Sequence, residues 1–121
     1  MGINCLIVEG VRGGKKKVAA LLVPVGYKYD MNSTVRKALD ARMVSVASLD
    51  FVLKETNMEY GSITPIGLPK DWLIFIDPLV LENEDIIIGG GLKKSKIKVP
   101  TSILLSFPNV KVLEGLAKPI N

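Results

Sequence analysis

The sequence KKVAALLVPVG, residues 16–26, is the feature that most constrains the fold of this chain. Its apolar residues occupy consecutive positions instead of alternating, which is typical of a strand covered on both faces. The earlier run INCLIVEG also has β-type composition, and Gly13 and Gly14 between the two runs suit the positive φ angles of a tight turn. We therefore predict a β-hairpin over residues 3–23 whose second arm is buried on both faces.

Short strands and helices alternate along the rest of the chain. Apolar spacing and capping residues predict helices over residues 30–42 and 48–57, and the segment after Pro100, residues 101–107, is also typical of a helix. Strands are predicted over residues 43–48, 72–77, 85–91, 96–100 and 109–115. The prediction is a single mixed α/β domain of the α+β kind, with six or seven short strands and three helices.

The composition excludes several catalytic classes. The 121-residue chain has no histidine and one cysteine, Cys5. Without histidine, neither a Ser-His-Asp nor a Cys-His mechanism is available, and we do not expect a zinc site. A cysteine on an apolar strand with no histidine to activate it is more typical of a buried, inert residue than of a nucleophile. We expect no metal and no cofactor.

Targeting signals are not evident in the sequence. The start, MGINCLIVEG, has neither the charged residues nor the cleavage site of a signal peptide. No apolar run approaches the roughly 20 residues of a membrane span. A lone cysteine cannot form an internal disulfide, which favours a reducing compartment. We therefore expect a cytoplasmic protein with no membrane partner.

Two glycine-rich loops, residues 59–69 and 89–91, are the candidate ligand sites. The first, EYGSITPIGLP, places Ser62 and Thr64 among glycines and prolines. Glycine lets a ligand approach the backbone amides closely, and proline fixes the shape of a loop. Such loops can bind an oxyanion, a carboxylate or a phosphate. The alternative is that both are tight turns in a compact sheet.

Charged residues leave two further alternatives open. Lysines cluster at residues 15–17 and 93–98 in a chain of net charge +4. They either bind the phosphates of a nucleic acid or, as we favour, lie on solvated and edge strands and prevent those strands from pairing with other chains. Asp77 ends an apolar strand beside Pro78. Its carboxylate either contributes to a catalytic site or, as we favour, caps the next element.

The order of several segments resembles a known family. The segments are NCLIV, AALLVPVGYKYDMNSTVRKALDAR, TNMEYGSITPIGLP, IFID and IIIGGG…KIKVP. Together they resemble the YbaK/ProX family of aminoacyl-tRNA editing domains, which is also found inserted in bacterial prolyl-tRNA synthetases. The resemblance covers roughly residues 3–117, and its most specific element is GSITP, residues 61–65, which fits the G-x-x-x-P loop of that family.

This resemblance implies a fold and a reaction. The implied fold is a mixed sheet curled into a barrel-like core with flanking helices. Members hydrolyse the ester of a mischarged aminoacyl-tRNA and release a small amino acid from its 3′ end. The resemblance implies that backbone amides at Gly61, Ser62 and Ile63 hold the scissile carbonyl, and that a ribose hydroxyl of the substrate activates the water. The residues that we assign to substrate binding are Thr64, Pro65, Asp77, Gly89, Gly90 and Gly91.

Three departures from the family pattern bear on activity. The functional lysine of the family lies on the first strand, where this chain has Asn4, an uncharged hydrogen-bond donor that we assign to the catalytic set. Gly89 stands where many relatives carry serine. Many members also carry a helical segment before the first strand, so we expect residues 1–121 to form a single editing domain without that segment.

Two functions remain open from the sequence. The first is an aminoacyl-tRNA deacylase that acts in trans on mischarged tRNA as a proofreading enzyme. The second is a catalytically impaired module that binds tRNA or a small ligand, or only dimerises, and the missing charge at Asn4 motivates it. The sequence fixes neither the amino acid nor the tRNA, and a homodimer is compatible with so short and apolar a chain.

Overall fold

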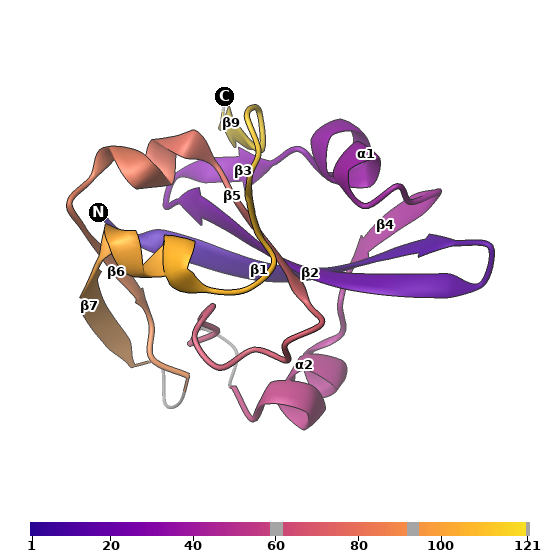
Figure 1. Cartoon of the computed structure of the whole chain (residues 1–121), viewed down its shortest axis with the longest axis horizontal. Helices are drawn as coiled ribbons and strands as arrows, with labels where there is room; N and C mark the ends of the chain where they lie inside the picture. The colour runs from indigo at the N-terminus through magenta and orange to yellow at the C-terminus, as the bar shows by residue number, and fades with distance from the viewer. Residues whose placement is uncertain (59–61, 92–94, 121) are drawn as a thin grey trace.

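A mixed central sheet organises the molecule (Figure 1). The computed structural model describes residues 1–58, 62–91 and 95–120. The central sheet has the order β4-β1-β2-β5-β8, and two further pairs, β3-β9 and β6-β7, flank it. The strands are β1 (Ile3–Arg12), β2 (Lys15–Pro24), β3 (Tyr27–Tyr29), β4 (Met43–Val46), β5 (Leu73–Ile76), β6 (Asp85–Gly89), β7 (Lys96–Pro100), β8 (Val110–Val112) and β9 (Ala117–Pro119).

The predicted hairpin is confirmed as the centre of this sheet. Strands β1 and β2 pair antiparallel from Ile3 opposite Pro24 to Arg12 opposite Lys15, and Gly13 has a φ of 58° in the turn. On its other side β2 pairs with β5 in parallel, and β5 pairs with β8 in parallel. The sheet is therefore mixed, and β2 lies between an antiparallel and a parallel neighbour.

The buried strand β2 divides the hydrophobic core into two halves, as its sequence predicts. Ala20 and Leu22 face one cluster, whereas Ala19, Leu21 and Val23 face the other, and all five are fully buried. Burial of a leucine side chain contributes roughly 1.5–3 kcal/mol, so this strand is a major source of stability. Residues of α2 and β6 cover the first half of the core, and residues next to α1 cover the second.

Short helical segments connect the strands and cover the two halves of the core. They are η1 (Met31–Val35), α1 (Arg36–Ala38), α2 (Leu49–Thr56), η2 (Pro78–Glu82) and η3 (Thr101–Ser106). Helices α1 and α2 lie on opposite sides of the hairpin (Figure 1). Helix α2 begins and ends as predicted, because Ser48 accepts a hydrogen bond from the Phe51 amide and Asn57 takes a left-handed conformation. None of the helices in the described ranges has the length and hydropathy needed to cross a membrane.

The fold class is confirmed, but several elements differ from the sequence-based expectation. The described residues contain nine strands instead of six or seven, since β3 and β9 were not predicted. Each is only three residues long, and they pair with each other from distant parts of the chain. The expected helix over residues 30–42 is shorter and begins with a π-helical turn, and residues 101–106 form a 3₁₀ helix.

Candidate functional site

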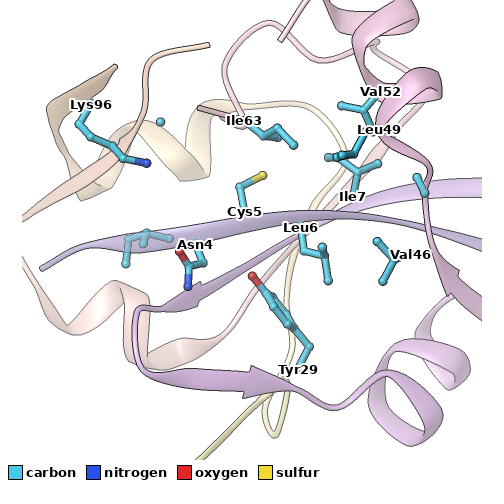
Figure 2. A pocket seen from close by; sticks show the side chains of 13 residues that line it. Asn4, Cys5, Leu6, Ile7, Tyr29, Val46, Leu49, Val52, Ile63 and Lys96 are labelled. Carbon is cyan, nitrogen blue, oxygen red and sulfur yellow. The ribbon is translucent and has the colours of Figure 1, made fainter. Parts of the chain in front are cut away.

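A cavity of about 560 Å³ lies beside β1 (Figure 2). Five consecutive residues of β1, residues 3–7, line it. The end of β4 and the start of α2 add further walls, and so do Ile63 from the first glycine-rich loop and Gly89 at the end of β6. Sequence segments that are far apart in the chain therefore meet at one cavity.

One end of the cavity is apolar. Its side chains come from the middle of β1, from the β4–α2 segment and from the loop, and they are Ile7, Val46, Ala47, Leu49, Val52 and Ile63. Val46 and Leu49 are exposed at 56% and 55%, so they form the rim, whereas Val52 is buried. This end suits an uncharged, apolar group of a ligand.

The other end carries the polar side chains Asn4, Tyr29 and Lys96 (Figure 2). Burial, followed by the neighbouring Cys5, raises the pKa of Tyr29 above its ordinary value, so its hydroxyl stays protonated and can donate a hydrogen bond. Of the described residues that line the cavity, none is an aspartate or a glutamate. This end therefore suits neutral or anionic groups of a ligand.

Cys5 also lines the cavity, but its thiol is not activated. Burial raises the pKa of Cys5 to about 12, so the thiolate is scarce at neutral pH. Figure 2 shows its sulfur on the side of β1 that carries Ile63. The prediction that Cys5 is not a nucleophile agrees with this environment.

The loop that contains Ser62 and Ile63 is held against the triple glycine. The Gly91 amide donates a hydrogen bond to the Ser62 carbonyl at 2.6 Å. A Cβ atom at Gly89 would lie 2.5 Å from the Ile63 carbonyl oxygen and 2.7 Å from that of Ser62, closer than real contacts allow. Only glycine at this position lets the loop approach β6 so closely, and a serine side chain would not fit here.

The amides of this loop have no backbone acceptor among the described residues. Among the backbone hydrogen bonds that join described residues, neither the Ser62 nor the Ile63 amide is a donor. The Ser62 hydroxyl is buried and has no hydrogen-bond partner among those residues. Gly61, whose amide is predicted to act together with those of Ser62 and Ile63, lies outside the described residues. The structure thus brings Asn4, Ile63 and Gly89 to one cavity, with Ser62 directly behind its wall.

The remaining predicted site residues support the loops and do not line this cavity. The Thr64 hydroxyl accepts a hydrogen bond from the Ile66 amide at 3.4 Å, and Pro65 beside it is buried. Gly90 donates to the Ser95 carbonyl at 2.8 Å, and Gly91 has a φ of 96°. Their roles in substrate binding stay predictions, and the contacts observed here are structural.

Asp77 takes the capping role that the sequence favours. Its Oδ1 accepts a hydrogen bond from the Leu79 amide and its Oδ2 accepts one from the Ala117 amide, both at 2.8 Å. Pro78 follows as the first residue of η2. The buried carboxylate thereby joins β5, η2 and β9, and it is not among the residues that line the cavity.

We expect Asp77→Asn to destabilise the fold without changing the chemistry. The amide group of asparagine can replace only one of the two acceptor oxygens, so one buried backbone N–H loses its partner, at a cost of roughly 1–3 kcal/mol. Urea unfolding followed by circular dichroism measures this change. Ligand binding per folded molecule should stay near the wild-type level, and a large loss of binding without loss of stability would instead place Asp77 in the functional site.

Sequence reasoning missed Tyr29 as a cavity residue and did not separate Lys96 from its cluster. Tyr29 lies on β3, which pairs only with the distant β9, so no local pattern places it. Lys98, two residues after Lys96, forms an ion pair with Asp85 at 4.0 Å. Lys16 in the first cluster pairs with Glu9 at 3.4 Å. The lysines of one cluster therefore differ in what they contact: Lys96 lines the cavity, whereas Lys98 pairs with Asp85. Lys93 and Lys94 lie outside the described residues.

The fold and the cavity define an α+β domain that can bind a ligand between a strand and a glycine-rich loop. The family model of the aminoacyl-tRNA editing domain matches residues 2–107, and the chain belongs to that family. The resemblance to YbaK-type proteins is thereby confirmed.

Solved structures share this fold at low sequence identity. Hypothetical protein APE2540 superposes with a TM-score of 0.80 at 20% identity, over 96% of this chain and 73% of its own. A candidate trans-editing enzyme for prolyl-tRNA synthetase superposes with a TM-score of 0.81 at 17% identity, over 97% and 70%. A signal transduction candidate from Marinobacter aquaeolei VT8 contains the fold within a larger chain, with a TM-score of 0.60 at 14% identity over 93% and 24%.

Proposed function

We propose that this protein is an aminoacyl-tRNA deacylase that acts in trans and hydrolyses the ester of a mischarged tRNA. The observation that carries the proposal is the loop at Ser62 and Ile63, which is held against Gly89 beside a cavity that also contains Asn4. Membership of the editing-domain family and the fold shared with a candidate trans-editing enzyme support it. We place the protein in the cytoplasm, as a single domain.

The loop amides act on the ester carbonyl in this proposal. Water attacks the carbonyl carbon, and the oxygen that becomes negative accepts hydrogen bonds from the Ser62 and Ile63 amides. The bond to the ribose oxygen then breaks, and that oxygen leaves with a proton while the free amino acid is released. One such donor typically contributes 10²–10³-fold to the rate.

The base in this reaction comes from the substrate. The chain has no histidine, and the cavity-lining residues that the structure describes include no acidic side chain. The Cys5 thiol, with its pKa raised to about 12, does not supply a base either. A neighbouring ribose hydroxyl of the tRNA can orient the water and accept its proton while passing its own proton to the departing ribose oxygen, in line with the activation by the substrate that the family resemblance implies. The protein then supplies position and electrostatic stabilisation.

Lys96 provides the positive charge that Asn4 does not. It extends from β7 over the polar end of the cavity (Figure 2). There its ammonium group can hold a phosphate of the terminal nucleotides. The apolar end beyond Ile63 then receives the amino-acid side chain, which favours substrates with small, uncharged side chains.

We expect Lys96→Gln to weaken binding of aminoacyl-tRNA by roughly 10- to 100-fold, since hydrogen bonds to charged groups contribute about 1.5–3 kcal/mol. Lys98→Gln is the matched control, because Lys98 lies on the same strand and is not among the cavity-lining residues. The KM for a mischarged tRNA measures the effect. Equal KM values for the two variants would show that Lys96 does not contribute to substrate binding.

A panel of tRNAs mischarged with different amino acids tests the proposed function. Release of the free amino acid is measured with purified protein and with buffer alone. We expect accelerated hydrolysis for tRNAs that carry small, uncharged amino acids. Rates equal to buffer for every tRNA would contradict the proposal and favour the impaired binding module.

A further inference from the structure

Strand β1 has two hydrogen-bonding edges, and consecutive residues use them in turn. The Gly2 carbonyl accepts from the Val25 amide, on the side of β2. The Ile7 and Val11 carbonyls accept from the Ala47 and Arg42 amides, on the opposite side. Odd-numbered residues of β1 therefore direct their N–H and C=O groups away from β2.

This outer edge is closed at both ends and open in the middle. At one end Gly2 bridges Ile87 in parallel, and the Ile87 amide donates to the Met1 carbonyl at 2.9 Å. At the other end the Ala47 amide donates to Ile7 at 2.9 Å, and β4 then pairs with β1 from Val8 onwards. Among the described residues, no backbone partner is shown for Cys5 on this edge.

The cavity lies along this open stretch. Successive side chains of a strand point to opposite faces, so a cavity lined by five consecutive residues must extend around the strand edge. Residues 3–7 all line it, and Figure 2 shows Cys5 on one side of β1, with Leu6 and Tyr29 on the other. The Cys5 N–H and C=O groups therefore face the cavity.

We infer that the open edge of β1 at Cys5 is a binding site for the main-chain part of a single aminoacyl group. An extended aminoacyl unit presents its amine and its carbonyl on one side, so it can form the two-bond ring of an antiparallel pair. The amine donates to the Cys5 carbonyl, and the ester carbonyl accepts from the Cys5 amide. This inference rests on the proposed function, since it states how that substrate is held.

The size of the opening and the chemistry of its walls favour this occupant. Only Cys5 points outward between Ile3 and Ile7, so the edge offers the length of one residue and not of a peptide strand. Because the described side chains that line the cavity include no carboxylate, a backbone carbonyl is a natural acceptor for the amine. The carbonyl oxygen of the ligand has two lone pairs, so it can accept from Cys5 and from a loop amide together.

Amide hydrogen exchange of the whole protein tests the inference without any substitution. The probe is 3′-alanylamino-3′-deoxyadenosine, in which an amide that cannot be hydrolysed as an ester replaces the scissile bond. We expect exchange at the Cys5 amide to slow at least tenfold when the probe binds. The Leu6 amide is the internal control, because Leu6 faces Leu21 of β2 and should be protected in both states.

A second probe, with a propionyl group in place of alanyl, lacks the amine and should bind roughly tenfold more weakly.

Unchanged exchange at Cys5 with the alanyl probe bound, or no binding of the alanyl probe, would overturn the inference. Equal protection by an extended tripeptide would also overturn it, because the site would then accept a peptide strand. Hydrolysis of mischarged tRNA without Cys5 protection would refute only this inference, whereas protection without hydrolysis would refute only the proposed deacylase.

Discussion

Gly89→Ala is expected to lower kcat/KM for a mischarged tRNA by roughly 10²–10³-fold, the typical effect of losing an oxyanion donor. A Cβ at this position would lie within 2.7 Å of backbone atoms of both Ser62 and Ile63. Backbone cannot rotate away as the end of a side chain can, so the loop must move from β6. In the proposed reaction, the Ser62 and Ile63 amides would then no longer be aligned with the carbonyl oxygen.

The matched control for this change is Ile87→Ala. Ile87 lies two residues earlier on β6, and its side chain is 42% exposed. We expect near wild-type kinetics for the control, whereas overpacking at Gly89 should also cost roughly 1–3 kcal/mol of folding free energy. Thermal unfolding of both variants separates the two effects. A folded Gly89→Ala protein with full activity would show that the loop position is not needed.

Val46→Trp is expected to block the cavity and lower kcat/KM by about 10²-fold, since a misplaced substrate loses the benefit of orientation. Val46 lies at the rim at the end of β4 and is 56% exposed, so a larger side chain can be accommodated without disturbing the core. The indole would cover the apolar end that we assign to the amino-acid side chain. Initial rates with a mischarged tRNA measure the effect.

Met43→Trp provides the comparison for the blocked cavity. Met43 is on the same strand, is 71% exposed and is not among the cavity-lining residues. We expect this variant to keep both the stability and the activity of the wild type. Equal activity of the two tryptophan variants would mean that the reaction takes place elsewhere on the protein.

Local chemistry accounts for the parts of the fold that were predicted from the sequence. The consecutive apolar residues of β2 require cover on both faces, and the structure provides a cluster on each. Ser48 and Asn57 mark the two ends of α2 through their preferred backbone conformations. Such signals depend on neighbours in the sequence, so they can be read without knowing the tertiary structure.

Long-range pairing accounts for what was not predicted. Tyr29 reaches the cavity because β3 pairs with β9, and three-residue strands carry too little periodicity to be recognised. Lys96 resembles its neighbours in sequence, and only the position of β7 places it at the cavity. The open edge at Cys5 depends on where β4 ends and on where β6 stops pairing with the start of the chain, which no residue of β1 specifies by itself.

Single-turnover deacylation with saturating protein tests the central claim most directly. The substrate is a tRNA mischarged with a small, uncharged amino acid, and the wild type is compared with Val46→Trp. We predict a rate far above buffer for the wild type and a rate about 10²-fold lower for the blocked variant. A wild-type rate equal to buffer, or equal rates for the two proteins, would contradict the claim that this cavity hydrolyses the ester.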